Sequence, residues 1–578
     1  MPTPRQAQCL LRFPINKCAY VSMARWASSP LVRERFRKMD TGAAALLRFI
    51  VVTLVAGLCA GMVLTAPPSA QVLAARICGG AGAFLRRHAG VVATTAIVAY
   101  AATFSVLSIL QHYSLRTHAF DLGVYDQVIW NSAQGRWLEL SLAERTLATD
   151  AMSYLGFHFS PTLALLVPFY WLYADPRVLL VLQSVLFASG AVPIYWLASR
   201  RLGRLWAMLF VFSYLSFPAL TYANLFDFHS VALVEPMLSF ALYYLLQRNY
   251  RVCLPLLLFA MLTKEDVGLI VAAFGAYVLI AQRRWRIGPL LVMGGLGWVY
   301  LATMLVIPSF APERSYYYLN RYAYLGSGVP EIMRNLVSHP LTVVSLLGDP
   351  GRLAFLLSLL VPLGFASLLG IEIFLLALPT IGYLLLSGSP SQYSPIFHYG
   401  AVLVPLLLVA GVEGVSRALG LLVRAKVAAR WKSSVPVAMA IFLAVSGLLS
   451  YTLNSRAPLS KSFQLRLYQT TEHTRLGLEL VSSLPPEASV SAQSDLVPHL
   501  TRRRYVYLFP DLKQADYILL DRQGYTYPLS RDDASYDQAV AAVLSRGDYE
   551  TVFDGDGYLL LRRAPQVAEQ TARFSGGE

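Results

Sequence analysis

Cysteine is scarce in this chain of 578 residues. Only five cysteines are present, no two of them form a C-x-x-C pair, and none follows Cys253. Disulfide-stabilised folds and cysteine zinc sites need several closely spaced thiols, so neither is expected. The H-x-x-x-H and H-E-x-x-H spacings of metalloenzymes are lacking as well. We therefore expect no cofactor, although a divalent metal held by one carboxylate and one imidazole stays open.

Charged residues are also few. They make up 14% of the chain, hydrophobic residues make up 56%, and the mean hydropathy is +0.51. A soluble protein of this length could not bury so much apolar surface, so the composition predicts an integral membrane protein. The net charge of +15 comes from arginines and lysines between apolar runs. This pattern is typical of cytoplasmic loops beside anionic lipid and does not indicate a nucleic-acid partner.

Apolar runs predict a polytopic helical bundle of about 11 or 12 spans, since a span needs about 20 apolar residues, or fewer if protein shields it. A run at 160–173 is too short to span and predicts a re-entrant or surface helix. The expected spans are residues 90–111, 177–199, 205–222, 231–246, 252–263, 267–281, 287–308, 353–370, 371–388, 400–416 and 434–453.

The basic loops give the orientation. Four arginine-rich loops (200–204, 248–251, 283–286 and 417–432) fall on one side of the expected spans, which should be the cytoplasm. The loop 112–160 and most other polar motifs then fall on the extracytoplasmic face of the cell membrane.

The two ends of the chain differ from the membrane domain expected at 90–453. Residues 1–89 form a basic extension with one further potential span, and a start at Met39 would remove most of its positive charge. Residues 454–578 alternate helix and strand patterns and end in a hairpin with "DG" at the turn. They predict a soluble extracytoplasmic α/β domain.

Several polar residues stand out against this apolar background. Asp121 lies between apolar neighbours directly after a span, where a low dielectric can tune a carboxylate for catalysis, and Asp126 follows in the same stretch. His158 precedes the short helix. Asp227 and His229 flank a phenylalanine at a helix junction and could share a proton or a metal.

The stretch "LTKEDVGL" interrupts about thirty apolar residues. Lys264 could hold a phosphate there, or it could merely neutralise Glu265 or Asp266 at a hairpin tip. Further candidates for binding a lipid phosphate or a sugar are Arg314, Arg321, His398 and Tyr399, although an interfacial aromatic belt would explain the tyrosines around the arginines.

The motifs "FDLGVYDQ", "HFSP", "NLFDFH", "KED", "FHYG" and "PPEASVSAQSDLVPHLTRRRYVYLFP" resemble the family of predicted membrane proteins called domain of unknown function 2079, over roughly residues 95 to 565. That family in turn resembles the C-type glycosyltransferases. The resemblance implies a polyprenyl-phosphate sugar as donor, with Asp121 acting on an acceptor hydroxyl and Lys264, Arg314 or His398 stabilising the departing phosphate. C-type enzymes often carry paired acids, whereas here Asp121 is single. Either Asp126 or Asp227 would then supply the second carboxylate, or the chemistry differs.

We therefore expect a membrane glycosyltransferase with a lipid-linked donor and an acceptor that the sequence does not define. A transporter or flippase of a lipid-linked or polar solute is the first alternative, although such proteins usually show related halves and no repeat is found here. A non-catalytic membrane scaffold is the second.

Overall fold

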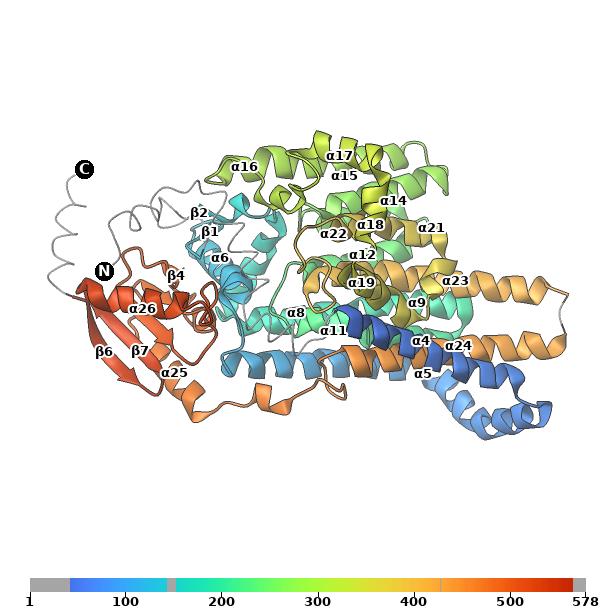
Figure 1. The fold of residues 1–578 in the computed structure, drawn as a ribbon. Helices are drawn as coiled ribbons and strands as arrows, with labels where there is room; N and C mark the ends of the chain where they lie inside the picture. Colours follow the sequence, from blue (N-terminus) through green and yellow to red (C-terminus); the bar gives the residue numbers. More distant parts are fainter. Residues whose placement is uncertain (1–41, 143–151, 427, 565–578) are drawn as a thin grey trace.

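The computed structural model describes residues 42–142, 152–426 and 428–564. A bundle of helices forms most of this part, and a twisted sheet with its own helices sits at one end of the bundle (Figure 1). The basic block at 1–41 and the acids Glu144 and Asp150 lie outside the described residues.

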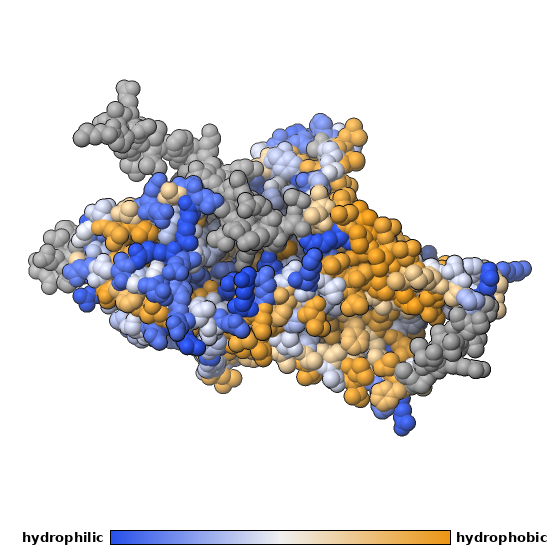
Figure 2. All heavy atoms as spheres, turned by 60° about the horizontal axis from the view of Figure 1, so that its bottom comes forward, coloured by the Kyte–Doolittle hydropathy of each residue, from blue (hydrophilic) through white to orange (hydrophobic). Residues whose placement is uncertain are grey.

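Six helices in the described part are long and apolar enough to cross a membrane, and a pair bent by 47° could form a seventh span. Figure 2 shows apolar side chains gathered over the bundle, while the end that carries the sheet and the far tip of the bundle are hydrophilic. The predicted membrane protein class is confirmed. The long helices are α4 (Gly42–Thr65), the Gly82–Tyr113 part of α5 (Pro68–Tyr113), α8 and α9 (Arg177–Ser189 and Ala191–Leu202), α15, η5 and α16 (Ile287–Tyr300, Leu301–Val306 and Ile307–Phe310), η9 and α23 (His398–Leu403 and Val404–Arg424), and α24 (Ala429–Asn454), and the bent pair is α10 and α11 (Arg204–Leu215 and Pro218–Asn224).

The other expected spans are shorter apolar helices, of 10 to 17 residues. Helices of this length are tolerated at membrane depth when neighbouring protein shields their ends. The run expected to be re-entrant is one of them. They are η4 and α7 (Pro161–Leu166 and Val167–Leu172), α12 (Val231–Leu246), α13 (Tyr250–Met261), α14 (Val267–Ile280), α19 and η7 (Pro350–Leu360 and Val361–Leu363), and α21, η8 and α22 (Ile371–Phe374, Leu375–Ala377 and Leu378–Leu385), with α20 (Ala366–Leu369) before the last group.

Glycines let α14 and α15 approach closely. A Cβ atom on Gly295 would lie 2.3 Å from the carbonyl oxygen of Gly268, and one on Gly275 would lie 2.8 Å from that of Gly288. The hydrophobic effect does not drive helix association within lipid. Small residues stabilise such crossings because they allow close van der Waals packing of the two helices. This packing fixes the start of α14, where Lys264, Glu265 and Asp266 precede the helix.

The C-terminal part forms a five-stranded sheet in the order β4-β3-β5-β7-β6. β3 (Val490–Ala492) pairs in parallel with β4 (Val506–Leu508) and β5 (Tyr517–Asp521), while β7 (Tyr558–Arg563) is antiparallel to β5 and to β6 (Tyr549–Gly555). Thr471 caps the helix before the sheet by accepting a hydrogen bond from the Thr474 N–H. The α/β fold class predicted for the C-terminal part is therefore confirmed. Its helical elements are η10 (Leu465–Tyr468), α25 (Glu472–Ser483), η11 (Val497–His499) and α26 (Ser535–Arg546).

The sheet docks on the loop that follows α5. The Ser141 hydroxyl donates to the Val506 carbonyl at 2.7 Å and accepts from the Val506 N–H at 3.0 Å. The rings of His112 and His499 stack at 3.9 Å. This loop therefore separates the bundle from the sheet and contacts both. The elements of this loop are η2 (Ala119–Gly123), α6 (Val124–Ala133), β1 (Glu139–Leu140), β2 (Met152–Ser153) and η3 (Tyr154–Gly156), and a second segment, after α16, holds η6 (Tyr317–Tyr322), α17 (Val329–Ser338) and α18 (Pro340–Leu346).

Asp126 is buried at this docking surface. The hydroxyls of Tyr170 and Thr501 donate to its two carboxylate oxygens, so that the side chain links the bundle to the sheet. Burial raises the pKa of Asp126 to about 6. Because both oxygens are occupied, this environment favours a structural role for Asp126 over the catalytic one expected from the sequence.

Replacing Asp126 with alanine should weaken docking by about 2 to 4 kcal/mol, because two buried hydroxyls lose their acceptors. Thermal unfolding in detergent and protease accessibility of residues 454–564 would measure the loss. Asp126→Asn keeps an acceptor oxygen and is the matched control, expected to remain close to wild type. An alanine variant as stable as the asparagine variant would contradict this role.

Candidate functional site

Asp121 lies in η2, the short π-helical turn between α5 and α6. Its carboxylate is 25% exposed, and its Oδ1 lies 2.8 Å from Nε2 of His229. The two residues are far apart in sequence, and their pairing confirms that the loop after α5 and the junction before α12 meet.

His229 is held in one orientation by its other ring nitrogen. Nδ1 lies 3.0 Å from the backbone carbonyl oxygen of Asp227, and the side chain of Gln183 binds both the Asp227 carbonyl and the His229 N–H. Both ring nitrogens therefore face oxygen atoms, and these two contacts fix the orientation of the ring. The Asp227 carboxylate accepts from the His118 N–H at 3.0 Å and so supports the same turn.

His398 and Tyr399 extend this cluster. The rings of His229 and His398 stack at 3.7 Å, and those of His398 and Tyr399 lie 4.2 Å apart. Nζ of Lys264 lies 6.0 Å from the centre of the Tyr399 ring. His398, Tyr399 and Lys264 line a narrow cavity together with Tyr383, Asp266 and the apolar side chains Val231, Val234, Val267, Ile270 and Val402.

The three charged residues of the "KED" motif have different partners. Lys264 pairs with Asp266 at 3.2 Å, as the hairpin-tip interpretation expected, and Tyr383 donates to the same carboxylate. Glu265 is buried and does not neutralise Lys264 directly. It accepts from Tyr316 at 3.1 Å and lies 2.8 Å from Nδ1 of His158.

Arg321 lies beside this group. Its guanidinium carbon lies 4.4 Å from the centre of the Tyr318 ring, which stacks on His158 at 4.8 Å. Within the described residues, no carboxylate lies close enough to form an ion pair with Arg321. In this part of the chain its positive charge is therefore compensated only by aromatic rings.

The structure therefore brings together most of the residues singled out in the sequence, but not all of them. Arg314 is exposed on the turn after α16, and Asp126 faces the docked sheet. Asp227, the other candidate for a second carboxylate, is buried, and its carboxylate accepts from the His118 N–H. Tyr316, Tyr318, Tyr383 and Gln183 were not expected: the first two lie in a tyrosine-rich stretch that resembles an interfacial belt, and the last two lie within apolar helices.

No group of three or more metal-ligating side chains occurs within the described residues. Asp121 and His229 form only a pair, and their contact is that of a hydrogen bond. Binding of a divalent metal thus stays a prediction from the sequence.

Comparison with known proteins gives distant structural neighbours. No curated protein sequence matches the chain. The structure of ArnT from Cupriavidus metallidurans bound to undecaprenyl phosphate is similar at 14% identity and a TM-score of 0.46, over 82% of this chain and 98% of that one. The apo oligosaccharyltransferase of Archaeoglobus fulgidus is similar at 12% identity and a TM-score of 0.41, over 82% and 74%.

The sequence signature of one family covers most of the chain, from residue 111 to residue 560. This range includes every polar residue of the cluster, from Asp121 to Tyr399, and nearly all of the C-terminal sheet. The protein belongs to the family of predicted membrane proteins known as DUF2079.

Proposed function

We propose that the protein is a membrane glycosyltransferase that transfers a sugar from a polyprenyl-phosphate donor to an acceptor hydroxyl on the extracytoplasmic face of the cell membrane. The observation that carries the proposal is the position of the Asp121–His229 pair. His229 stacks on His398, which lines a cavity together with Lys264 and several apolar side chains. The resemblance of the motifs to C-type glycosyltransferases supports the same reaction.

Asp121 is the proposed base. The acceptor oxygen forms a bond to the anomeric carbon, the hydroxyl proton passes to the Asp121 carboxylate, and the bond between the anomeric carbon and the phosphate oxygen breaks with its electron pair on the phosphate. His229 uses only Oδ1 of Asp121. Its fixed ring orients the carboxylate towards the acceptor hydroxyl.

Lys264 and Arg321 are the proposed phosphate ligands. Charge-assisted hydrogen bonds to a phosphate become stronger as negative charge develops on the leaving group. Lys264 shares its charge with Asp266, whereas Arg321 contacts aromatic rings, so Arg321 should contribute more. The valines and the isoleucine that line the cavity are the proposed contacts for the first prenyl units of the donor.

The activity can be tested with purified protein in nanodiscs. A panel of radiolabelled polyprenyl-phosphate sugars should yield free polyprenyl phosphate and a labelled acceptor from membrane extract. Absence of sugar release from every donor would overturn the proposal, and counterflow of a labelled solute in proteoliposomes would favour a transporter instead.

The sidedness of the site can be tested separately. In a variant without native cysteines, Arg200→Cys and Arg283→Cys should resist a membrane-impermeant maleimide added to intact cells. Ser545→Cys in the C-terminal part is the matched exposed position and should react. Labelling of the Arg200→Cys or Arg283→Cys variant from outside would contradict an extracytoplasmic site, because those loops lie at the opposite end of the spans.

A further inference from the structure

Two segments of the C-terminal part reach the turn that carries Asp121. The Tyr525 ring lies 4.9 Å from His118, and the Tyr527 ring lies 5.8 Å from Phe120. The Ala119 N–H donates to the Ser494 hydroxyl at 3.4 Å. The residues directly before Asp121 are therefore set by contacts with the sheet as well as by α5.

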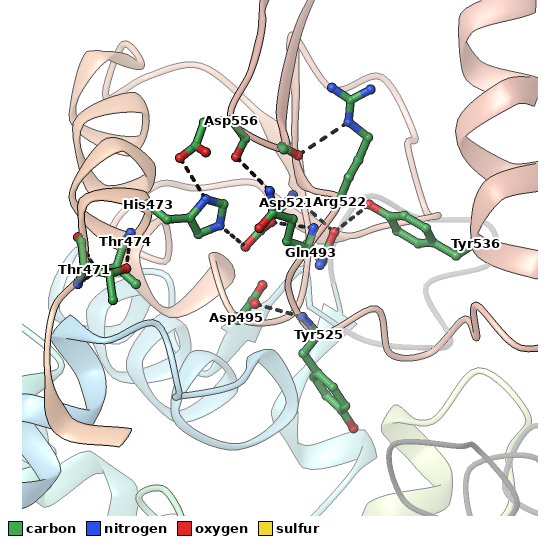
Figure 3. A network of polar contacts seen from close by, with 12 residues as sticks. Thr471, His473, Thr474, Gln493, Asp495, Asp521, Arg522, Tyr525, Tyr536 and Asp556 are labelled. Carbon is green, nitrogen blue, oxygen red and sulfur yellow. Dashed lines mark hydrogen bonds and ion pairs between the residues drawn. The ribbon is translucent and has the colours of Figure 1, made fainter. Parts of the chain in front are cut away.

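The loop that carries Tyr525 and Tyr527 follows β5 and is anchored by one buried carboxylate. Oδ2 of Asp495 accepts the Tyr525 N–H at 3.0 Å (Figure 3). The Asp495 side chain is 4% exposed, and its Oδ1 has no hydrogen-bond partner among the described residues. A Cβ atom on Gly524 would lie 2.5 Å from Asp495 Oδ2 and 2.6 Å from Asp521 Oδ2, so the loop closes tightly over both carboxylates.

A network of charged groups surrounds this anchor. His473 on α25 lies 3.1 Å from both Asp521 and Asp556, and its place between them is visible in Figure 3. Gln493 accepts from the Asp521 N–H and from the Tyr536 hydroxyl. Titratable and charged groups surround Asp495 from several elements: α25, β5 and the loop after it, α26, the β6–β7 turn, β7 and the loop after α5. They are His473, Asp521, Arg522, Tyr536, Asp556, Tyr558 and Arg116.

We propose that Asp495 is a positioning residue, which holds the loop 524–527 against residues 118–120 and thereby fixes the turn that presents Asp121 to the substrates. Its effect on the reaction rests on the proposed function. Its effect on the turn does not, because the contacts exist in the protein without substrate.

The anchor should respond to pH. Burial, and then the charge of Asp521, raise the pKa of Asp495 to about 7. A carboxyl whose pKa is raised by docking stabilises the docked loop fully below pH 3.8, and this contribution is lost as the pH rises towards 7. For His473, burial opposes protonation, but the hydrogen bonds and charges of Asp521 and Asp556 outweigh it and raise the pKa. The ion pairs of His473 with Asp521 and Asp556 are also lost as the pH rises. A rise in pH therefore weakens the anchoring of the loop through both Asp495 and His473.

Hydrogen exchange of the full chain in nanodiscs tests the proposal without any substrate. We expect Asp495→Ala to increase exchange at least tenfold in peptides covering 522–528 and also 117–124, with β5 and β7 unchanged. Asp495→Asn keeps an oxygen for the Tyr525 N–H and should restore protection. In wild type, loop opening corrected for intrinsic exchange should increase about 50-fold between pH 5 and pH 7, and the asparagine variant should lose most of this dependence.

The outcomes are separable. Faster exchange at 522–528 with unchanged exchange at 117–124 would overturn the proposal, as would unchanged exchange at both. If Asp495→Ala also increases exchange in β5 and β7, the variant disturbs the whole sheet, and Tyr525→Ala is then the test. This variant removes the ring contact with His118 but keeps the buried carboxyl, so it should increase exchange in residues 117–124 alone. In sugar transfer, Asp495→Ala should lower kcat and Asp495→Asn should restore it. Wild-type protein that transfers no sugar but shows the exchange pattern would contradict only the proposed function.

Discussion

Replacing Asp121 with asparagine should lower kcat for sugar transfer by about 10²- to 10⁴-fold, the range that a general base contributes. The amide is nearly isosteric but cannot accept the proton of the acceptor hydroxyl. The donor KM should change little, because Lys264 and Arg321 remain in place. Single-turnover release of polyprenyl phosphate from a labelled donor would measure the chemical step.

The surface variant Glu479→Gln is the control for this experiment, since it removes an exposed carboxylate of α25 that is remote from the cavity. His229→Gln should lower kcat less than Asp121→Asn, because glutamine can still hydrogen-bond and orient the carboxylate. An Asp121→Asn variant with more than half of the wild-type kcat would place the base elsewhere.

The second large effect is expected at Arg321. Arg321→Met should lower kcat/KM for the donor by about 10- to 100-fold, because charge-assisted hydrogen bonds contribute about 1.5 to 3 kcal/mol and 1.4 kcal/mol corresponds to a factor of ten. Removing this cation leaves no carboxylate unpaired within the described residues, so folding should be preserved. Lys264 is a poorer choice for the test, because its loss would leave Asp266 without its partner.

Arg314→Met is the matched control, since it removes the same charge from an exposed position of the same segment. Arg321→Lys should be intermediate, because an ammonium carries the charge but lacks the planar pair of donors that a guanidinium offers to a phosphate. Equal losses in Arg314→Met and Arg321→Met would indicate a general electrostatic effect and would contradict a phosphate ligand at Arg321.

The sequence was sufficient for the class of the protein because hydropathy and periodicity are local properties. Apolar runs identified the long helices, and short strand patterns with "DG" at the turn identified β5 and the hairpin that contains β7. The same local patterns predicted spans at 252–263 and 267–281, where the helices α13 and α14 prove short. Their length is tolerated because neighbouring helices cover them, and no local pattern records which helix is the neighbour.

The sequence also identified the types of residue at the site, since a charge in an apolar run needs a physical reason. Only the tertiary structure decided how they pair. His229 orients Asp121, 108 positions away, and Glu265 binds His158 in place of its neighbour Lys264. Asp126 resembles Asp121 in its local sequence, yet it contacts Thr501, 375 positions away. Hydrogen bonds act over about 3 Å, so the role of each carboxylate depends on which distant segment packing brings within that distance.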